Sequence, residues 1–235
     1  MPVLVMKFGG TSVADLSRIE NAAKKVQAEV DAVVVALKSR TLPPHEAVAQ
    51  SLEALRWLQA QQVEQVYFKY CSTFDSWYRG DVRGNIGPVT EALMTALGCS
   101  LTIATPAFPD NQRTVFNGHL FVGDVLLSES GMKDHPLTPM NDANLVRVMQ
   151  AQCQRPVGLV DYRVVAQGAD AIRARLDLLR AQGVAVAVVD VNDLGRVKVL
   201  ASSPGCDEAL LQRALRPNPA GNANERTPLV LVRPS

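Results

Sequence analysis

The sequence predicts an α/β protein with a mostly parallel sheet that is flanked by helices on both faces. Short apolar runs alternate with longer segments of helical spacing over most of the first 190 residues. The run AVVVAL at 32–37 is continuous and β-branched, as in a strand buried on both faces. A β-hairpin insertion is expected near 113–122, where Asn117-Gly118 separates two strand-like segments.

In the first part of the chain, each apolar run ends at polar or glycine residues, and helical spacing follows. Gly9-Gly10 ends the first run, and Pro43-Pro44 begins the second helix. A loop rich in Gly, Asp and Arg extends from Cys71 to Pro88. The expected strands are 3–8, 32–37 and 66–70, and the expected helices are 14–30 and 43–58.

Regular alternation continues to Asp190, and the pattern then weakens. Three prolines and three asparagines lie between Arg216 and Pro228, so residues 191–235 are expected to form an irregular C-terminal tail. Residues 1–190 are expected to form one α/β domain, with an atypical start at 1–30. The remaining expected helices are 89–97, 141–152 and 166–182, and the remaining strands are 101–104, 113–116, 119–122, 157–160 and 184–189.

Composition excludes several classes of function. Lys+Arg number 24 against 23 Asp+Glu, so binding to nucleic acid through bulk charge is not expected. No apolar run approaches the roughly 18 residues of a membrane span, and no membrane partner is expected. Four cysteines without a C-x-x-C pair favour a cytoplasmic protein with free thiols. His45, His119 and His135 share no metal-ligand spacing, so no metal site is expected within the chain.

Polar residues that follow strands are the candidate binding residues, because ligands of such sheets lie at the carboxyl ends of the strands. The first set is Lys7, Gly9, Gly10, Thr11 and Ser12. Glycines let the backbone approach an anion, and a helix N-terminus offers free N–H groups, so this set could bind phosphate or carboxylate. The alternative is an ordinary strand-to-helix turn that is capped by a hydroxyl.

Two further sets follow the second and third strands. Ser39 and Arg40 could bind a carboxylate, or Ser39 could cap the next helix. Lys69, with hydroxyls and a carboxylate within eight residues, suits a polyhydroxylated acid; Arg79 or Arg83 could add a bidentate contact. The alternative for this set is a solvated turn capped by Asp75. Its polar residues are Ser72, Thr73, Asp75 and Ser76.

Several stretches between residues 31 and 190 resemble a known family. They include DAVVVALKSRTLPPHEAVAQSLEAL, YFKYCSTFDS, GNIGPVTEALMTALG and GLVDYRVVAQGADAIRARL. They look like the N-terminal, sugar-acid-binding domain of the four-carbon acid sugar kinases, also called 3-oxo-tetronate kinases. The resemblance implies ATP- and Mg-dependent phosphorylation of a sugar-acid hydroxyl, in carbohydrate metabolism, with the substrate between an N-terminal domain and a C-terminal nucleotide domain.

The resemblance also implies roles for individual residues. Arg40 and Lys69 would bind the substrate carboxylate, Asp75 and Ser76 would fix its hydroxyls, and Asp75 is the catalytic candidate. The substrate-binding residues that match the family's motifs are Ser39, Arg40, Lys69, Asp75, Ser76, Gly84, Asn85, Asn117 and His119. Arg83 is added to them for its charge, with Arg79 of the same expanded loop as the alternative.

A second, shorter resemblance covers residues 3–26. VLVMKFGGTSVADLSRIENAAKKV is similar to the start of the aspartate kinases. In that family the matching residues line the phosphates of ATP. The implied phosphate-binding residues are Lys7, Gly9, Gly10, Thr11 and Ser12.

Three departures from the sugar-acid kinases leave alternatives open. KFGGTS stands where that family has an acidic loop, the loop DSWYRGDVRGN is expanded, and the Gly-rich nucleotide motifs have no counterpart after Asp190. We therefore expect the substrate-binding half of a kinase, either as a fragment or as one half of a split enzyme whose nucleotide site lies on a separate chain. The alternatives are a non-catalytic sugar-acid-binding module, a fragment of an amino-acid kinase like aspartate kinase, and a gene remnant.

Overall fold

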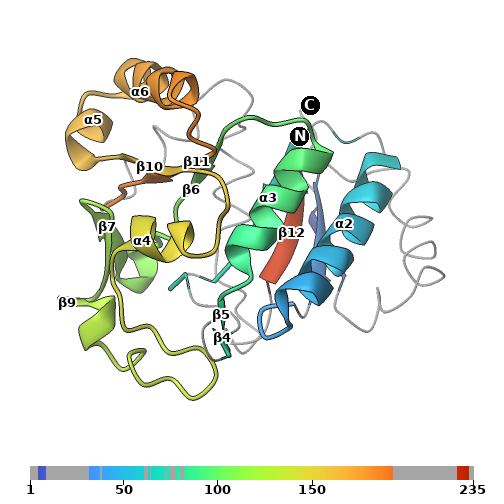
Figure 1. Cartoon of the computed structure of the whole chain (residues 1–235), viewed down its shortest axis with the longest axis horizontal. Coiled ribbons are helices and arrows are strands. Elements are labelled where there is room, and N and C mark those ends of the chain that lie inside the picture. Colours follow the sequence, from blue (N-terminus) through green and yellow to red (C-terminus); the bar gives the residue numbers. More distant parts are fainter. Residues whose placement is uncertain are drawn as a thin grey trace.

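The chain forms two main β-sheets with helices packed against them (Figure 1). The computed structural model describes residues 5–8, 32–37, 39–60, 63, 65–71, 73–74, 78–79, 82–192 and 227–232. The α/β class expected from the sequence is confirmed, although the strands are divided between two sheets instead of forming one.

The first sheet has the strand order β1-β2-β12-β3. β1 and β2 are parallel, whereas β12 is antiparallel to both of its neighbours, β2 and β3. β1, β2 and β3 therefore run in one direction, and their carboxyl ends lie at the same edge. The strands are β1 (Val5–Phe8), β2 (Ala32–Leu37), β12 (Thr227–Val232) and β3 (Gln65–Phe68).

Helices α2 (Pro44–Ala60) and α3 (Ile86–Ala96) pack together beside this sheet (Figure 1). The buried residues of α2 recur at intervals of three and four, which places them on one face of the helix. That face packs against Val35 of β2 and against α3. The buried apolar residues of this cluster are Val35, Ala47, Ala54, Leu55, Leu58, Val89 and Leu93.

The second sheet is parallel, with the order β10-β11-β6. Successive side chains of its central strand point to opposite faces. Val186 and Val188 belong to the cluster that includes α4 and the hairpin of residues 113–122, whereas Ala187 and Val189 belong to the cluster of α5 and α6. The elements are β10 (Val157–Val160), β11 (Val186–Val189), β6 (Thr102–Ala104), α4 (Leu145–Gln150), α5 (Tyr162–Ala166) and α6 (Ala169–Ala181).

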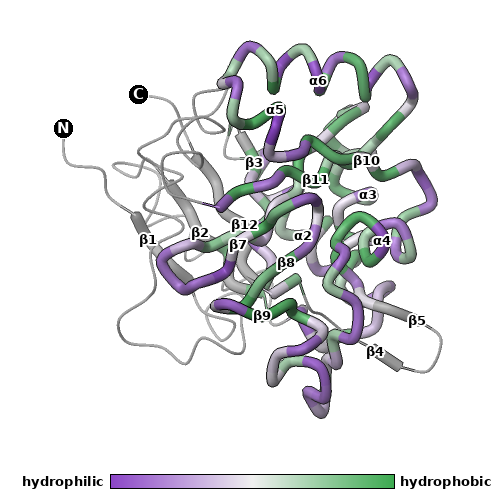
Figure 2. The backbone as a smooth tube through the Cα atoms, turned by 90° about the vertical axis from the view of Figure 1, so that its left-hand side faces the viewer, coloured by the Kyte–Doolittle hydropathy of each residue, from purple (hydrophilic) through white to green (hydrophobic). Residues whose placement is uncertain are grey.

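The expected hairpin is confirmed, and a third strand extends it. Figure 2 shows the strands of the second sheet between α5 and α6 on one side and this hairpin on the other. A second antiparallel pair, β4 with β5, lies in the loop after β3. The elements are β7 (Arg113–Phe116), β8 (His119–Val122), β9 (Val125–Leu126), β4 (Tyr78–Arg79) and β5 (Val82–Arg83).

Three of the expected helices begin three or four residues from where the structure begins them. The helix expected at 166–182 is α6, which begins at Ala169; the separate short helix α5 precedes it, and Gly168 adopts φ 96° between the two. α3 begins at Ile86, before the expected 89, and α4 covers only Leu145–Gln150 of the expected 141–152. The helix expected at 14–30 lies outside the described residues.

Part of the segment expected to be an irregular tail is a strand. Thr227–Val232 forms β12 between β2 and β3, so the expectation does not hold for these six residues. The misleading signal was the group of prolines and asparagines that ends at Pro228; proline has no N–H to donate and normally argues against a central strand. The apolar run after Pro228 is short, and its two partner strands are remote in the sequence.

Candidate functional site

The sequence-predicted residues Ser39, Arg40 and Lys69 lie at one edge of the first sheet. Ser39 and Arg40 follow β2, and Lys69 follows β3, which runs in the same direction. Ser39 is 3% exposed, Arg40 is 9% exposed, and Lys69 is half-buried. A buried serine and a buried arginine, with a lysine at the same edge of the sheet, offer the hydroxyl and cationic groups that a carboxylate-bearing ligand requires.

The turn formed by residues 39–42 is held by the side chain of Asn85. Asn85 Nδ2 donates to the carbonyl oxygens of Ser39 at 2.7 Å, of Arg40 at 3.3 Å and of Leu42 at 2.9 Å. Leu42 N also donates to Ser39 O at 3.1 Å within the turn. One buried amide therefore fixes the backbone of the residues that are expected to bind the substrate.

Asn85 bonds to the 39–42 turn instead of capping its own helix. It occupies the N-cap position of α3, where asparagine normally accepts hydrogen bonds from the first helical N–H groups. Its side chain makes no such cap bond, and it is 4% exposed. Gly84 precedes it with φ 72°, a conformation that favours glycine. The structure thus brings together four of the sequence-predicted residues: Ser39, Arg40, Gly84 and Asn85.

The loop after β3 is anchored by Phe74. This residue is 1% exposed, has φ 58°, and packs edge-on against Tyr70 with ring centroids 5.4 Å apart. A positive φ is uncommon for a bulky side chain, so the surrounding core must hold the loop in this conformation. Asp75 and Ser76, the expected hydroxyl-binding residues, follow directly but lie outside the described residues, and only the backbone of Arg83 is described, in β5.

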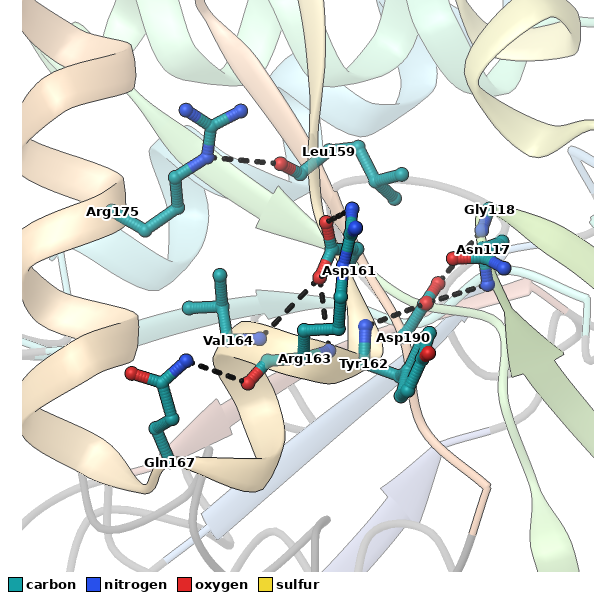
Figure 3. Close-up of polar contacts among 10 residues, drawn as sticks. All are labelled: Asn117, Gly118, Leu159, Asp161, Tyr162, Arg163, Val164, Gln167, Arg175 and Asp190. Atoms are coloured by element: carbon teal, nitrogen blue, oxygen red, sulfur yellow. Dashed lines mark hydrogen bonds and ion pairs between the residues drawn. The ribbon is translucent and has the colours of Figure 1, made fainter.

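A second set of predicted residues lies at the hairpin turn of residues 117–118 (Figure 3). Asn117 and Gly118 have φ values of 48° and 71°, which fit a type I′ turn. Asp190, at the end of β11, accepts from Asn117 N at 2.6 Å, Gly118 N at 2.8 Å and Tyr162 N at 2.9 Å. Tyr162 begins α5, so one carboxylate joins the hairpin to this helix.

The carboxylates of this region have opposite pKa shifts. Burial raises the pKa of Asp190, which is 1% exposed, and the three N–H donors oppose that rise. The hydrogen bond from the Arg163 guanidinium lowers the pKa of Asp161, with further help from the N–H groups that this residue caps, against an opposing effect of burial. Because Asp190 bonds to three backbone N–H groups, it fixes the turn and is poorly placed to bind a ligand itself.

His119 connects the hairpin to α4. Its Nδ1 lies 2.8 Å from the carbonyl oxygen of Asn117, which can only accept, so Nδ1 carries the proton. Nε2 then accepts from the amide of Asn144 at 3.3 Å. Asn144 in turn caps α4 by accepting from Arg147 N at 3.0 Å. These contacts give His119 a structural role within the hairpin.

The predicted residues therefore form two separate groups. In the part of the chain that is described, Asn117 and His119 bond to Asp190 and Asn144, and not to the 39–42 turn. The phosphate-binding candidates cannot be added to either group: Lys7 is described only as backbone in β1, and Gly9, Gly10, Thr11 and Ser12 lie outside the described residues.

Asp190 was not among the residues predicted for the site. The signal for it was present, because Asp190 directly follows the strand expected at 184–189, and the same rule selected Ser39 and Lys69. Among the described residues, no group of three or more His, Cys, Asp or Glu side chains is arranged to hold a metal ion. The described helices include none long and apolar enough to cross a membrane.

Comparison with known families places this geometry in context. The family described as a sugar-binding N-terminal domain matches residues 4–225. That match includes both the stretch resembling acid sugar kinases and the start resembling aspartate kinases.

Named relatives agree with the family match. A 3-oxo-tetronate kinase of Pseudomonas fluorescens is 57% identical over 182 residues, which are 77% of this chain and 41% of the relative. A 3-oxo-tetronate kinase of Actinobacillus succinogenes is 50% identical over 211 residues, 86% of this chain and 50% of the relative. The chain thus spans half or less of the length of these relatives.

Solved structures show the same fold. A Haemophilus influenzae protein is 54% identical, with a TM-score of 0.71 over 75% of this chain and 42% of its own. A Bordetella bronchiseptica domain, a domain-swapped dimer with bound citrate, is 25% identical, with a TM-score of 0.62 over 85% of this chain and 44% of its own.

Proposed function

Since this chain belongs to the four-carbon acid sugar kinase family, as its sugar-binding N-terminal domain, we propose that it binds the sugar-acid substrate at the carboxyl edge of the first sheet. Arg40 and Lys69 would bind the carboxylate. Ser39, with Asp75 and Ser76 from the following loop, would contact the hydroxyl groups. Phosphorylation of one of those hydroxyls is the proposed activity of the assembled kinase.

The observation that carries this proposal is the fixed 39–42 turn. Ser39 and Arg40 are buried at the edge of the sheet, and Asn85 holds the carbonyl groups of both. A guanidinium binds a carboxylate through two parallel hydrogen bonds, and fixing its backbone lowers the entropy cost of that contact. Lys69, which follows β3 at the same edge of the sheet, with β12 between β3 and β2, would provide a second cation.

Citrate in the Bordetella relative supports the proposed class of ligand. Citrate is a small acid that carries both carboxylate and hydroxyl groups, as a four-carbon sugar acid does. The two ligands make the same chemical demands on a site, namely cations for the carboxylates and hydrogen-bonding groups for the hydroxyls.

ATP and Mg²⁺ are implied by the kinase relatives. The described residues provide no cluster of metal-binding side chains, so they do not fit a metal site, and no transfer step is assigned to them. Lys7, Gly9, Gly10, Thr11 and Ser12 remain the proposed phosphate contacts within this chain. The other possibility is that a separate nucleotide-binding chain or domain provides the ATP site.

Calorimetric titration of the full chain with a four-carbon sugar acid tests the proposal. We expect binding without nucleotide, and we expect Arg40→Gln to weaken it at least tenfold, the loss of one charged hydrogen-bonding partner. Arg56→Gln is the matched control. Arg56 is exposed on α2, about 18 Å along the helix axis from its first residue, and the substitution removes the same charge.

Titration of a second variant and titration with a second ligand test the position of the site and the class of its ligand. Asp75→Asn should weaken binding while the fold is retained, and equal binding by that variant would show that Asp75 is not a ligand contact. L-Aspartate is the comparison ligand, because residues 3–26 resemble aspartate kinases. A folded chain that binds aspartate and no sugar acid would overturn the proposal. Repeating the titration with Mg-ATP shows whether this chain contributes a nucleotide site.

A further inference from the structure

Gln152, just beyond the end of α4, lies directly against the N-terminus of α3. Its Oε1 accepts from Gly87 N at 3.1 Å, and its Nε2 donates to Val148 O at 3.2 Å. A Cβ on Gly87 would lie 2.5 Å from the Cβ of Gln152, and a Cβ on Gly84 would overlap the Gln152 amide. Both glycines therefore leave the space that the Gln152 side chain occupies.

Gln152 supplies the cap that Asn85 does not. The first N–H groups of a helix have no partner within the helix, and the N-cap side chain normally accepts from one of them. In α3, Gly87 is the second helical residue, and its N–H donates to Gln152 instead of to Asn85. The amide of Asn85 is thereby left to hold the carbonyl groups of Ser39, Arg40 and Leu42.

We propose that Gln152 is a positioning residue for the sugar-acid site: by capping α3 it keeps Asn85 on the 39–42 turn. Without this acceptor, the unsatisfied Gly87 N–H favours rotation of Asn85 into the cap. The carbonyl groups of the turn then lose their common donor, and Arg40 loses its fixed backbone. The part of this inference that concerns ligand affinity rests on the proposed function; the part that concerns the turn does not.

The contact between Gln152 and Gly87 joins α3, which packs beside the first sheet, to the end of α4, which packs beside the second sheet. Ile86, the first residue of α3, belongs to the same buried cluster as Leu145 and Met149 of α4. α4 also contacts β10 of the second sheet. The position of the 39–42 turn beside the first sheet therefore depends on a side chain held by the second half of the chain.

Gln152→Met in the full chain tests the inference, since methionine has a similar length and no comparable acceptor. The readout of the turn is hydrogen exchange at the amide of Leu42, which bonds to Ser39 O. We expect exchange to accelerate about five- to tenfold, the effect of losing one net hydrogen bond, and sugar-acid affinity to fall by a similar factor. Gln152→Glu, which keeps an acceptor at a helix N-terminus, should restore most of both.

Gln150→Met is the matched control. Gln150 is the last residue of α4 and bonds to Cys153 O, Arg155 O and Val157 N, and not to Gly87 or the 39–42 turn. Leu42 exchange that is unchanged in Gln152→Met, or equally accelerated in Gln150→Met, would overturn the inference. If Gln152→Met does not fold, Gln152→Asn, which is too short to reach Gly87, replaces it. A parent chain that binds no sugar acid, with Leu42 exchange accelerated as expected, would refute the proposed function and support the positioning role.

Discussion

Two turns of this molecule are each held by one buried polar side chain, and they are held by opposite chemistry. At residues 39–42, the amide of Asn85 donates to three carbonyl oxygens. At residues 117–118, the carboxylate of Asp190 accepts from three N–H groups, two in the turn and one at the start of α5.

The difference predicts unequal rigidity. Hydrogen bonds to a carboxylate are roughly twice as strong as neutral ones, and a buried carboxylate has no favourable alternative partner. Amide-to-carbonyl bonds contribute about 1 kcal/mol each, and the amide of Asn85 has the N-terminus of α3 as an alternative. We therefore expect both turns to be held in place, and we expect the 39–42 turn to be the more easily released when one of its contacts is removed.

Asp190→Ala should have the largest effect on stability. Three backbone N–H groups, one of them in a fully buried contact, lose their acceptor, and we expect the free energy of unfolding to fall by about 3 kcal/mol. Urea unfolding followed by circular dichroism measures it. Asp190→Asn retains one acceptor oxygen, so its free energy of unfolding should lie between those of the parent and Asp190→Ala. A loss below about 1 kcal/mol would show that solvent or neighbouring groups satisfy these N–H donors.

Asn85→Ala should have a smaller effect on stability and a larger one on ligand binding. We expect the free energy of unfolding to fall by about 2 kcal/mol, because neutral bonds are lost and the turn carbonyls can in part reach water. Sugar-acid affinity should fall at least tenfold, since Arg40 loses its fixed backbone.

Asn111→Ala is the control for that variant, because Asn111 is an exposed asparagine after Pro109 and Asp110. Equal losses of affinity in the two variants would show that Asn85 has no special relation to the ligand.

Gly118→Ala should cost about 1–2 kcal/mol of stability, because an L side chain is disfavoured at its φ of 71°. The new Cβ would also lie 3.3 Å from Val146 Cγ2, which must shift slightly. Thermal unfolding measures the change. Gly131→Ala serves as the control, since no atom lies within 4 Å of a Cβ at that position. A stabilised Gly118→Ala would contradict the rigid turn that Asp190 is expected to hold.

The smallest expected effect is the pH dependence at Asp161. The pKa of Asp161 in the folded chain is lowered from 3.8. Its charged form therefore stabilises the folded state above that pH, and this stabilisation is lost as pH falls through the folded pKa. Asp161→Asn keeps a capping oxygen and removes the charge. We expect it to be less stable than the parent by under about 1 kcal/mol at pH 6, and the difference to vanish in acid. A difference that is constant with pH would exclude the charge as its cause.

Asp190 should show the opposite sign. Burial raises the pKa of Asp190 in the folded chain above 3.8. Protonation of Asp190 therefore stabilises the folded state fully below that pH, and this stabilisation is lost as pH rises through the folded pKa. The measurement is the free energy of unfolding of the parent and of Asp190→Asn at several pH values between 3 and 6. Its pH dependence should have the opposite sign to that of Asp161. A stability difference between the parent and the variant that does not change over this range would contradict the raised pKa.

The order of strands and helices was largely predictable from the sequence. β2, β6, β10 and the hairpin were expected at their observed positions or very near them, because apolar periodicity and the Asn-Gly turn are local signals. Helix ends were less predictable. Asn85 was expected to lie in a loop before the helix, and Asp161, which caps α5, was not recognised as a cap.

The candidate site was predictable only in part. Ser39, Arg40 and Lys69 were selected because they follow strands, and the structure places them at one edge of the first sheet. Asp190 also follows a strand, so the same rule applies to it, although it was not among the predicted residues. No local pattern pointed to Gln152, because its contact with Gly87 joins residues that are far apart in the chain.

The sequence by itself therefore determined the α/β class, the hairpin and the family, since each depends on periodicity or on contiguous residues. Only the tertiary structure decided that β12 lies between β2 and β3, and that Asn85 bonds to the 39–42 turn instead of capping α3. The physical reason is common to both. A strand edge or an amide bonds to whichever partner packing brings within reach, and that choice is made between residues distant in sequence.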